Sequence, residues 1–227
     1  MAKSWDQRSK ITARSEARRC FILLGMKPER IPKANGRPRE FDPDDALEKA
    51  MHLFWTKGFD GVSISDLTAT MGVNRPSLYA TFGNKEELFR KAFSRYMTGH
   101  ISAVRLAEHF ATVKQAVEAY LFNSADFLAQ PEHPGCLAVV GALAWSDESE
   151  AIRQELSGAR NDVLGVWRER FEAAQATGEI PPAPHAADLA RYVMTVATGM
   201  TVQARSGATR EELRRVAEIS MRAWPSA

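Results

Sequence analysis

GFDGVSISDLTATMGVNRPSLYATFGNKEELF, residues 58–89, predicts two short helices joined by a tight turn, with a third helix directly after them. Ser63 is a good N-cap, and Asp66 three residues later completes a capping pattern that marks a helix start. Gly72 supplies the backbone freedom that a sharp turn needs. The stretch therefore predicts a helix-turn-helix over residues 63–82.

The second short helix has one apolar face and one polar face. Asn74 caps it, and Pro76 falls in its first turn, where a missing N–H has no intrahelical partner in any case. Leu78 and Phe82 are four residues apart and face inward. The outer face suits base edges and phosphates in a DNA major groove. It carries Asn74, Arg75, Ser77, Tyr79 and Thr81.

The spacing G-F-x-x-V-S-I-x-D-L-x-x-x-M-G-V-N-x-x-S-L-Y-x-x-F-x-N-K-E-x-L resembles the DNA-binding domain of the TetR family of bacterial transcriptional regulators. The resemblance covers residues 41–96. It implies an all-α protein, with an N-terminal three-helix helix-turn-helix domain and a C-terminal helical domain for ligand binding and dimerisation. Thr68 and Met71 stand where the family usually has alanine, and Thr81 where histidine is common, so no relative's base preference carries over.

The start of the third helix joins the expected DNA contacts. Asn84 followed by Glu87 predicts a capping box, and the family's lysine at the position of Lys85 commonly meets a phosphate. A plain surface lysine is the alternative. The contacts expected in this stretch are Ser63, Ser65, Asn74, Arg75, Ser77, Tyr79, Thr81 and Lys85.

Residues 1–40 are basic, with 11 Lys and Arg against 4 Asp and Glu, in a chain whose net charge is +2. Such a segment is typical of a solvated or disordered tail, but beside a helix-turn-helix it favours nucleic-acid binding. Within it, Gly36-Arg37-Pro38-Arg39 resembles the arm that precedes helix 1 in many family members, where an arginine enters the minor groove. Arg37 and Arg39 are therefore expected to contact DNA, a solvated linker being the alternative.

The expected organisation has three parts. A basic extension and arm covers residues 1–38, the DNA-binding domain covers 39–99, and the ligand-binding and dimerisation domain covers 100–227. Met26 begins a stretch that would make a conventional amino terminus for the family, so we expect the natural start there and residues 1–25 to be an extension.

Composition narrows the class of protein. Of the 227 residues, 44% are hydrophobic and 26% are charged, which is ordinary for a globular protein. The two cysteines, Cys20 and Cys136, provide no disulfide framework, and they favour a reducing compartment. No stretch approaches the roughly 18 apolar residues of a membrane span. We expect a cytoplasmic protein without a membrane partner, associated with the nucleoid when bound to DNA.

The second half predicts helices near residues 113–129, 136–145, 148–176, 185–205 and 209–224. The resemblance implies that the last two pair with their copies in a homodimer, although a core stripe explains the same residues equally well. The dimerisation residues expected on this basis are Val193, Val196, Ala197, Met200 and Ala204. An apolar ligand cavity is expected, with space-filling in a helical core as the alternative. Its expected lining is Tyr120, Phe127, Cys136, Trp145, Trp167, Phe171 and Met194.

Several kinds of site are not expected. His133 and Cys136 form one short His/Cys pair without a second pair at ligand spacing, so we expect no metal and no cofactor. Cys136 is either a buried structural thiol or a redox or electrophile sensor. The sequence contains no G-x-S-x-G, no H-E-x-x-H and no phosphate-cradling glycine loop, so an enzyme is not expected.

The combined expectation is a homodimeric, ligand-responsive transcriptional repressor that a small molecule releases from a palindromic DNA operator. An activator and a ligand-independent architectural DNA-binding protein are the alternatives.

Overall fold

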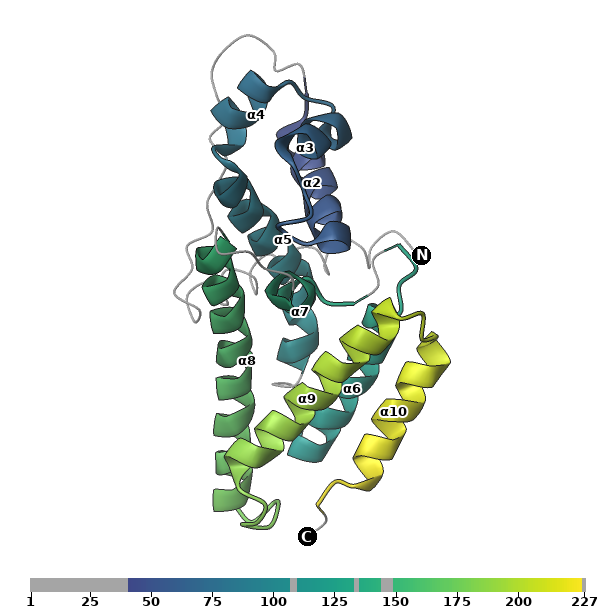
Figure 1. The fold of residues 1–227 in the computed structure, drawn as a ribbon. Helices are drawn as coiled ribbons and strands as arrows, with labels where there is room; N and C mark the ends of the chain where they lie inside the picture. Colours follow the sequence, from purple (N-terminus) through teal and green to yellow (C-terminus); the bar gives the residue numbers. More distant parts are fainter. Residues whose placement is uncertain (1–40, 107–109, 133–134, 144–148, 226–227) are drawn as a thin grey trace, which may run out of the picture. The chain divides into compact units, whose positions relative to one another are not determined.

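The computed structural model describes residues 41–106, 110–132, 135–143 and 149–225 (Figure 1). Its regular elements over these residues are α-helices, which confirms the predicted all-α fold class. The described residues divide into two compact units. The first contains residues 41–51 and 64–102, and the second contains residues 52–63 and 103–225.

The first four helices carry the predicted helix-turn-helix. They are α2 (Pro43–Lys57), α3 (Ile64–Met71), α4 (Arg75–Phe82) and α5 (Lys85–Leu106). The α2 start is fixed by the Asp42 carboxylate, whose Oδ1 accepts a hydrogen bond from the backbone N–H of Asp44 at 2.9 Å. Acidic side chains in this first turn also favour the helix, because they lie at the positive end of its dipole.

The first unit closes around a small apolar core. Its most buried members are Ala50, Leu67, Leu78, Phe82, Leu88 and Ala92, each without exposed surface. A polar contact joins the two longer helices, because the Arg95 guanidinium of α5 forms ion pairs with Asp44, at 3.5 Å, and with Glu48 of α2. The two longer helices of this unit are thus tied to each other by charge.

The second unit contains the other five described helices, close to the predicted spans. They are α6 (Val113–Leu128), α7 (Leu137–Leu143), α8 (Glu150–Ala176), α9 (Ala186–Arg205) and α10 (Arg210–Arg222). Thr112 caps α6, where its hydroxyl accepts a hydrogen bond from Gln115 N at 3.2 Å. A capping box formed by Thr209 and Glu212 begins α10. α8 and α6 both pack against α9, and α10 packs against α6 and α9 (Figure 1).

The C-terminal end of α2 belongs to the second unit. The Trp55 indole N–H donates a hydrogen bond to the Gly135 carbonyl at 3.0 Å, and the Trp55 ring stacks on Phe127 at 5.4 Å between centroids. The Arg205 guanidinium donates to the Thr56 carbonyl at 3.1 Å. One continuous helix therefore begins in the first unit and ends in the second.

No helix among the described residues is both long enough and apolar enough to cross a membrane.

Candidate nucleic-acid interface

The turn between α3 and α4 has the geometry that the sequence predicts. Gly72 has φ +70°, a left-handed conformation that glycine adopts without steric cost. The backbone N–H of Val73 donates to the Thr68 carbonyl at 3.1 Å, which ends α3 at the turn. Met71, where the family usually has alanine, is only 3% exposed, so the larger side chain is accommodated in the core.

Helix α4 has one buried apolar face and one exposed polar face, as its sequence indicates. Asn74 Oδ1 accepts from the Ser77 backbone N–H at 2.8 Å, which is the predicted N-cap. Leu78 and Phe82 have no exposed surface, and the Phe82 ring contacts Phe41 with a centroid distance of 6.3 Å. Tyr79 points the other way and is 48% exposed. The helix therefore exposes the Tyr79 phenol on one face while Leu78 and Phe82 fix its other face in the core.

Arg75 and Ser65, expected as two separate contacts, form one unit. The Arg75 Nη2 donates to the Ser65 hydroxyl at 2.9 Å, which bridges α4 and α3. The Ser65 carbonyl in turn accepts from the Thr68 hydroxyl at 3.0 Å. Because its partner is a neutral hydroxyl, the guanidinium keeps its full charge and further N–H donors for a phosphate or a guanine edge.

Three other basic side chains of this unit are paired with neighbouring acids. Lys49 pairs with Asp45 at 2.7 Å, and Arg90 pairs with Glu86 at 3.1 Å. Arg95 is paired with carboxylates of α2, as described above. Among these four cations, Arg75 is the one whose positive charge is not balanced by a carboxylate.

The start of α5 is fixed by the predicted capping box. The Asn84 backbone N–H donates to Glu87 Oε2 at 2.9 Å, and the Glu87 N–H donates to Asn84 Oδ1 at 2.8 Å. Gly83 precedes the box with φ +79°, and a Cβ there would lie 1.7 Å from Glu87 Oε2. Glycine is therefore required for the box to close. Lys85 occupies the first position of α5 and is half-buried.

The other expected contacts differ in their exposure. Ser63 is exposed immediately before α3, whereas Ser77 and Thr81 are half-buried on α4. Arg37 and Arg39 lie outside the described residues. One contact of α4 was not predicted from the sequence. The Lys91 ammonium of α5 donates to the Phe82 carbonyl at 3.4 Å, at the C-terminal end of α4. No local sequence signal links a residue inside α5 to that carbonyl.

Four of the expected ligand-lining residues come together in the second unit. Tyr120 and Trp167 have ring centroids 5.2 Å apart, and Trp167 and Phe171 have centroids 5.6 Å apart. The Tyr120 hydroxyl donates to the Met194 sulfur at 3.6 Å. Burial chiefly raises the pKa of Tyr120 above its ordinary value, with a smaller contribution in the same direction from nearby Cys136.

The other ligand-lining candidates are placed differently. Phe127 stacks on Trp55, as described above, and Trp145 lies outside the described residues. Cys136 is half-buried and packs against the second unit's core. Among the described residues no cluster of three or more His, Cys, Asp or Glu could hold a metal ion.

Four of the five residues expected at a dimer interface lie in the core of the second unit. Val193, Ala197, Met200 and Ala204 are between 0% and 8% exposed, so they have little surface left for a partner. The fifth, Val196, is half-buried. The large apolar side chains exposed on α9 and α10 are instead Tyr192, Val202, Val216 and Ile219.

Comparison with known proteins agrees with these features. The family description "bacterial regulatory proteins, tetR family" matches residues 46–92, and "tetracyclin repressor-like, C-terminal domain" matches residues 112–220. The HTH-type transcriptional repressor ComR of Escherichia coli (strain K12) is 34% identical over 86% of this chain and 94% of its own length. The repressor BdcR of the same strain is 28% identical over 84% of this chain and 91% of its own.

Solved structures extend the likeness to three dimensions. A cysteine-substituted variant of the TetR family transcriptional regulator CifR, complexed with 26-bp double-stranded operator DNA, is 38% identical to this chain, with a TM-score of 0.79. The match covers 84% of this chain and 100% of that one. Both halves of the sequence and the helical fold thus match the same group of proteins, and the chain belongs to the TetR family of bacterial transcriptional regulators.

Proposed function

We propose that this protein is a homodimeric repressor that binds a palindromic operator and is released from it by a small molecule. The observation that carries the proposal is the outward face of α4, where Arg75 and exposed Tyr79 project from a helix fixed by buried Leu78 and Phe82. The names of ComR and BdcR, both repressors, and the operator complex of CifR support it. Such a regulator acts in the cytoplasm, on the nucleoid when bound.

Contacts to bases and to phosphates divide between the elements of the interface. Arg75 and Tyr79 lie on the outward face of the second helix of a helix-turn-helix, the position that reads base edges in a major groove. Lys85, at a helix start, suits a phosphate, where backbone N–H groups and the helix dipole also favour an anion. The first group gives specificity, and the second fixes the protein on the duplex.

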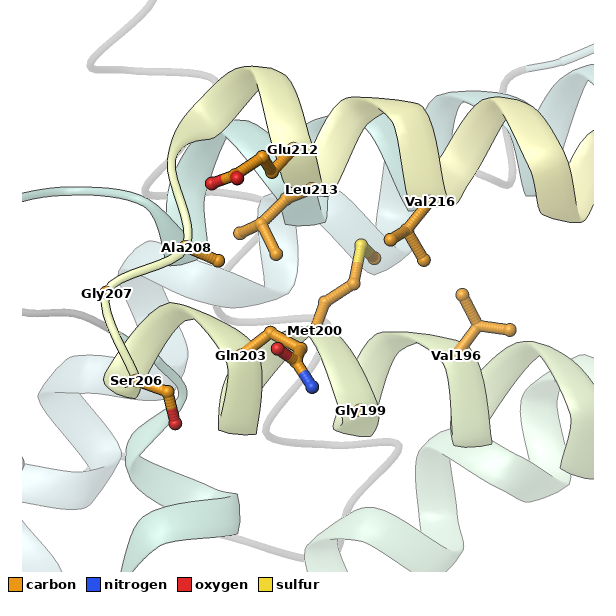
Figure 2. Close-up of a pocket in the computed structure, with 10 residues that line it drawn as sticks. All are labelled: Val196, Gly199, Met200, Gln203, Ser206, Gly207, Ala208, Glu212, Leu213 and Val216. Atoms are coloured by element: carbon orange, nitrogen blue, oxygen red, sulfur yellow. The ribbon is translucent and has the colours of Figure 1, made fainter.

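A dimer has a specific surface available between α9 and α10. The two helices line an open groove of about 620 Å³. Figure 2 shows Val196 and Met200 of α9 facing Leu213 and Val216 of α10 across it. A second copy laid against the same face would cover this groove and the exposed valines and isoleucine beside it, in a two-fold interface. Two recognition helices about 34–36 Å apart would then meet successive turns of a palindrome.

Helix α2 provides a route for the ligand response. Its N-terminal half is tied to α5 by Arg95, and its C-terminal end is fixed in the second unit by the Trp55–Gly135 hydrogen bond. A ligand that binds the second unit and prefers a different packing there shifts the population of α2 positions, and hence operator affinity. Because linkage is reciprocal, operator binding lowers the protein's affinity for that ligand by the same factor.

Arg75→Ala is expected to weaken operator binding by about 1–3 kcal/mol, since a guanidinium that reads a base is lost. Tyr79→Ala is expected to fall in the same range for the same reason. The measurement is a gel-shift titration with a duplex selected from a random-sequence pool by the wild-type protein. Arg90→Ala is the matched control, because that guanidinium is already paired with Glu86. Unchanged affinity in both α4 variants would contradict the assigned interface.

Ser65→Ala is expected to reduce operator affinity by a smaller amount, roughly 0.5–1.5 kcal/mol, because one net hydrogen bond that orients Arg75 is removed. Combining it with Arg75→Ala tests the mechanism. If Ser65 acts only through Arg75, the double variant binds no more weakly than Arg75→Ala alone. Additive losses would mean that the serine contacts DNA by itself.

Lys85→Ala is expected to weaken binding to the selected duplex and to random-sequence DNA equally. Its effect is then electrostatic, and the slope of log affinity against log salt concentration should fall in magnitude by about 1. Fluorescence anisotropy at several salt concentrations measures both quantities. A loss confined to the selected duplex would instead place Lys85 at a base.

A further inference from the structure

Trp167, near the middle of α8, has a buried donor without an acceptor. Its side chain is 1% exposed, and its buried indole Nε1 has no hydrogen-bond partner among the described residues. Leaving a buried N–H unsatisfied costs about 1–3 kcal/mol, so this position favours any molecule that brings an acceptor.

Tyr120, whose hydroxyl also forms a side-chain hydrogen bond with Ser124, places a second donor beside the first. Its ring lies 5.2 Å from the Trp167 ring, and its hydroxyl donates to the Met194 sulfur, a thioether and therefore a weak acceptor. Burial raises the pKa of Tyr120, so the phenol remains protonated and available as a donor at neutral pH. A ligand oxygen would be a better partner than sulfur for this group.

No fully buried side chain of the described residues supplies a compensating charge. The buried polar side chains of the described residues are Ser149, Thr201 and Ser220, and none of them is ionisable in the neutral range. Phe171 continues the aromatic cluster from Trp167 to Trp224, with ring centroids 5.6 Å apart at each step. An anion or cation brought here would lose its hydration, and no fully buried opposite charge of the described residues would replace it.

We infer that Trp167 and Tyr120 form the polar end of a binding site for an uncharged small molecule, which has an apolar body and one oxygen acceptor. The inference rests on the proposed function, because it names the chemistry of the molecule that would release the repressor. Met194 is the side chain best suited to move aside for the ligand, since its unbranched thioether adopts alternative rotamers at low cost.

The test uses three probes of similar size: acetophenone, which is neutral with a carbonyl oxygen, ethylbenzene, which has no acceptor, and benzoate, which is charged. Isothermal titration calorimetry of the full chain measures their affinities. Acetophenone is expected to bind roughly tenfold more tightly than ethylbenzene, the value of one net hydrogen bond. Benzoate is expected to bind more weakly than both.

The indole signal of Trp167 provides a direct readout. The chain has five tryptophans, so a ¹⁵N-labelled sample gives few indole N–H signals, and Trp167→Phe identifies the relevant one. Acetophenone is expected to move that signal more than the others. Trp167→Phe should remove the preference for acetophenone over ethylbenzene, whereas Trp55→Phe should retain it, because the Trp55 N–H already bonds Gly135.

Each other outcome overturns the inference. These outcomes are equal affinities for acetophenone and ethylbenzene, tightest binding of benzoate, no binding of any probe, or a preference that survives in Trp167→Phe. Should Trp167→Phe not fold, Tyr120→Phe replaces it, and the preference for acetophenone must then fall. Operator binding by the wild-type protein is measured separately. Its absence would contradict the proposed function, whereas intact DNA binding without a preference for acetophenone contradicts only the inferred ligand chemistry.

Discussion

A protein that carries both Val216→Asp and Ile219→Asp is expected to be monomeric and to bind its operator roughly 10²- to 10⁴-fold more weakly. Ile219 is 63% exposed and Val216 is 38% exposed on α10, beside the groove shared with α9. In a two-fold dimer, each change would bury an unpaired carboxylate twice, at a cost of several kcal/mol for each ion. Without the second subunit, one recognition helix binds alone, and the avidity gained from two linked half-sites is lost.

Sedimentation equilibrium measures the oligomeric state, and gel-shift titration measures the affinity. Val166→Asp is the matched control, since Val166 is a 41% exposed valine on a different helix, α8. It should leave both quantities unchanged. If the double variant remains a dimer, the α9–α10 face is not the interface, even if the protein still binds DNA as a dimer through another surface.

The helix-turn-helix could be predicted because its signals are local. A helix start depends on a cap and on the first turn, and Asn74 with Ser77 and Asn84 with Glu87 form their hydrogen bonds within three residues. The turn at Gly72 depends on one residue's access to positive φ. None of these features needs information about distant parts of the chain.

The pairing of Arg75 with Ser65 could not be predicted, since it depends on the crossing of α3 and α4 and on the rotamer of a long side chain. The placement of Trp55 had a similar cause. In the sequence it belongs to an apolar stripe that also contains Leu47 and Met51, yet its indole is bonded to a carbonyl 80 residues away. Periodicity shows which side chains are buried, but not which neighbours bury them.

Helix α9 shows the same limit more sharply. Apolar residues lie on more than one side of it, so the sequence does not separate the side that faces the second unit's core from the side that faces solvent. Val193 and Met200 face the core, whereas Val202 is 46% exposed. The exposed fractions of the side chains distinguish the two sides of α9. They depend on how α6, α8 and α10 pack around this helix.

Phe82→Ala is expected to reduce the free energy of unfolding of the first unit by about 3–5 kcal/mol, and to lower operator affinity with it. Phe82 has no exposed surface, and its ring contacts Phe41 and lies at the end of α4. Truncation removes the buried ring and leaves a cavity that rigid neighbouring helices fill only in part. Hydrogen exchange of amides in residues 64–96, measured with and without the substitution, reports the loss for this unit alone.

Tyr79→Ala provides the decisive comparison, because it removes a ring of similar size from the same helix, three residues away. The Tyr79 ring is 48% exposed, so its truncation should change amide protection by less than about 1 kcal/mol while still weakening operator binding. If α4 binds DNA through its outward face, the two variants should differ. Phe82→Ala should lower the free energy of unfolding, whereas Tyr79→Ala should lower operator affinity without a matching loss of stability. Equal destabilisation by the two variants would mean that α4 does not present Tyr79 to a partner, and the outward face of the helix would have to be reassigned.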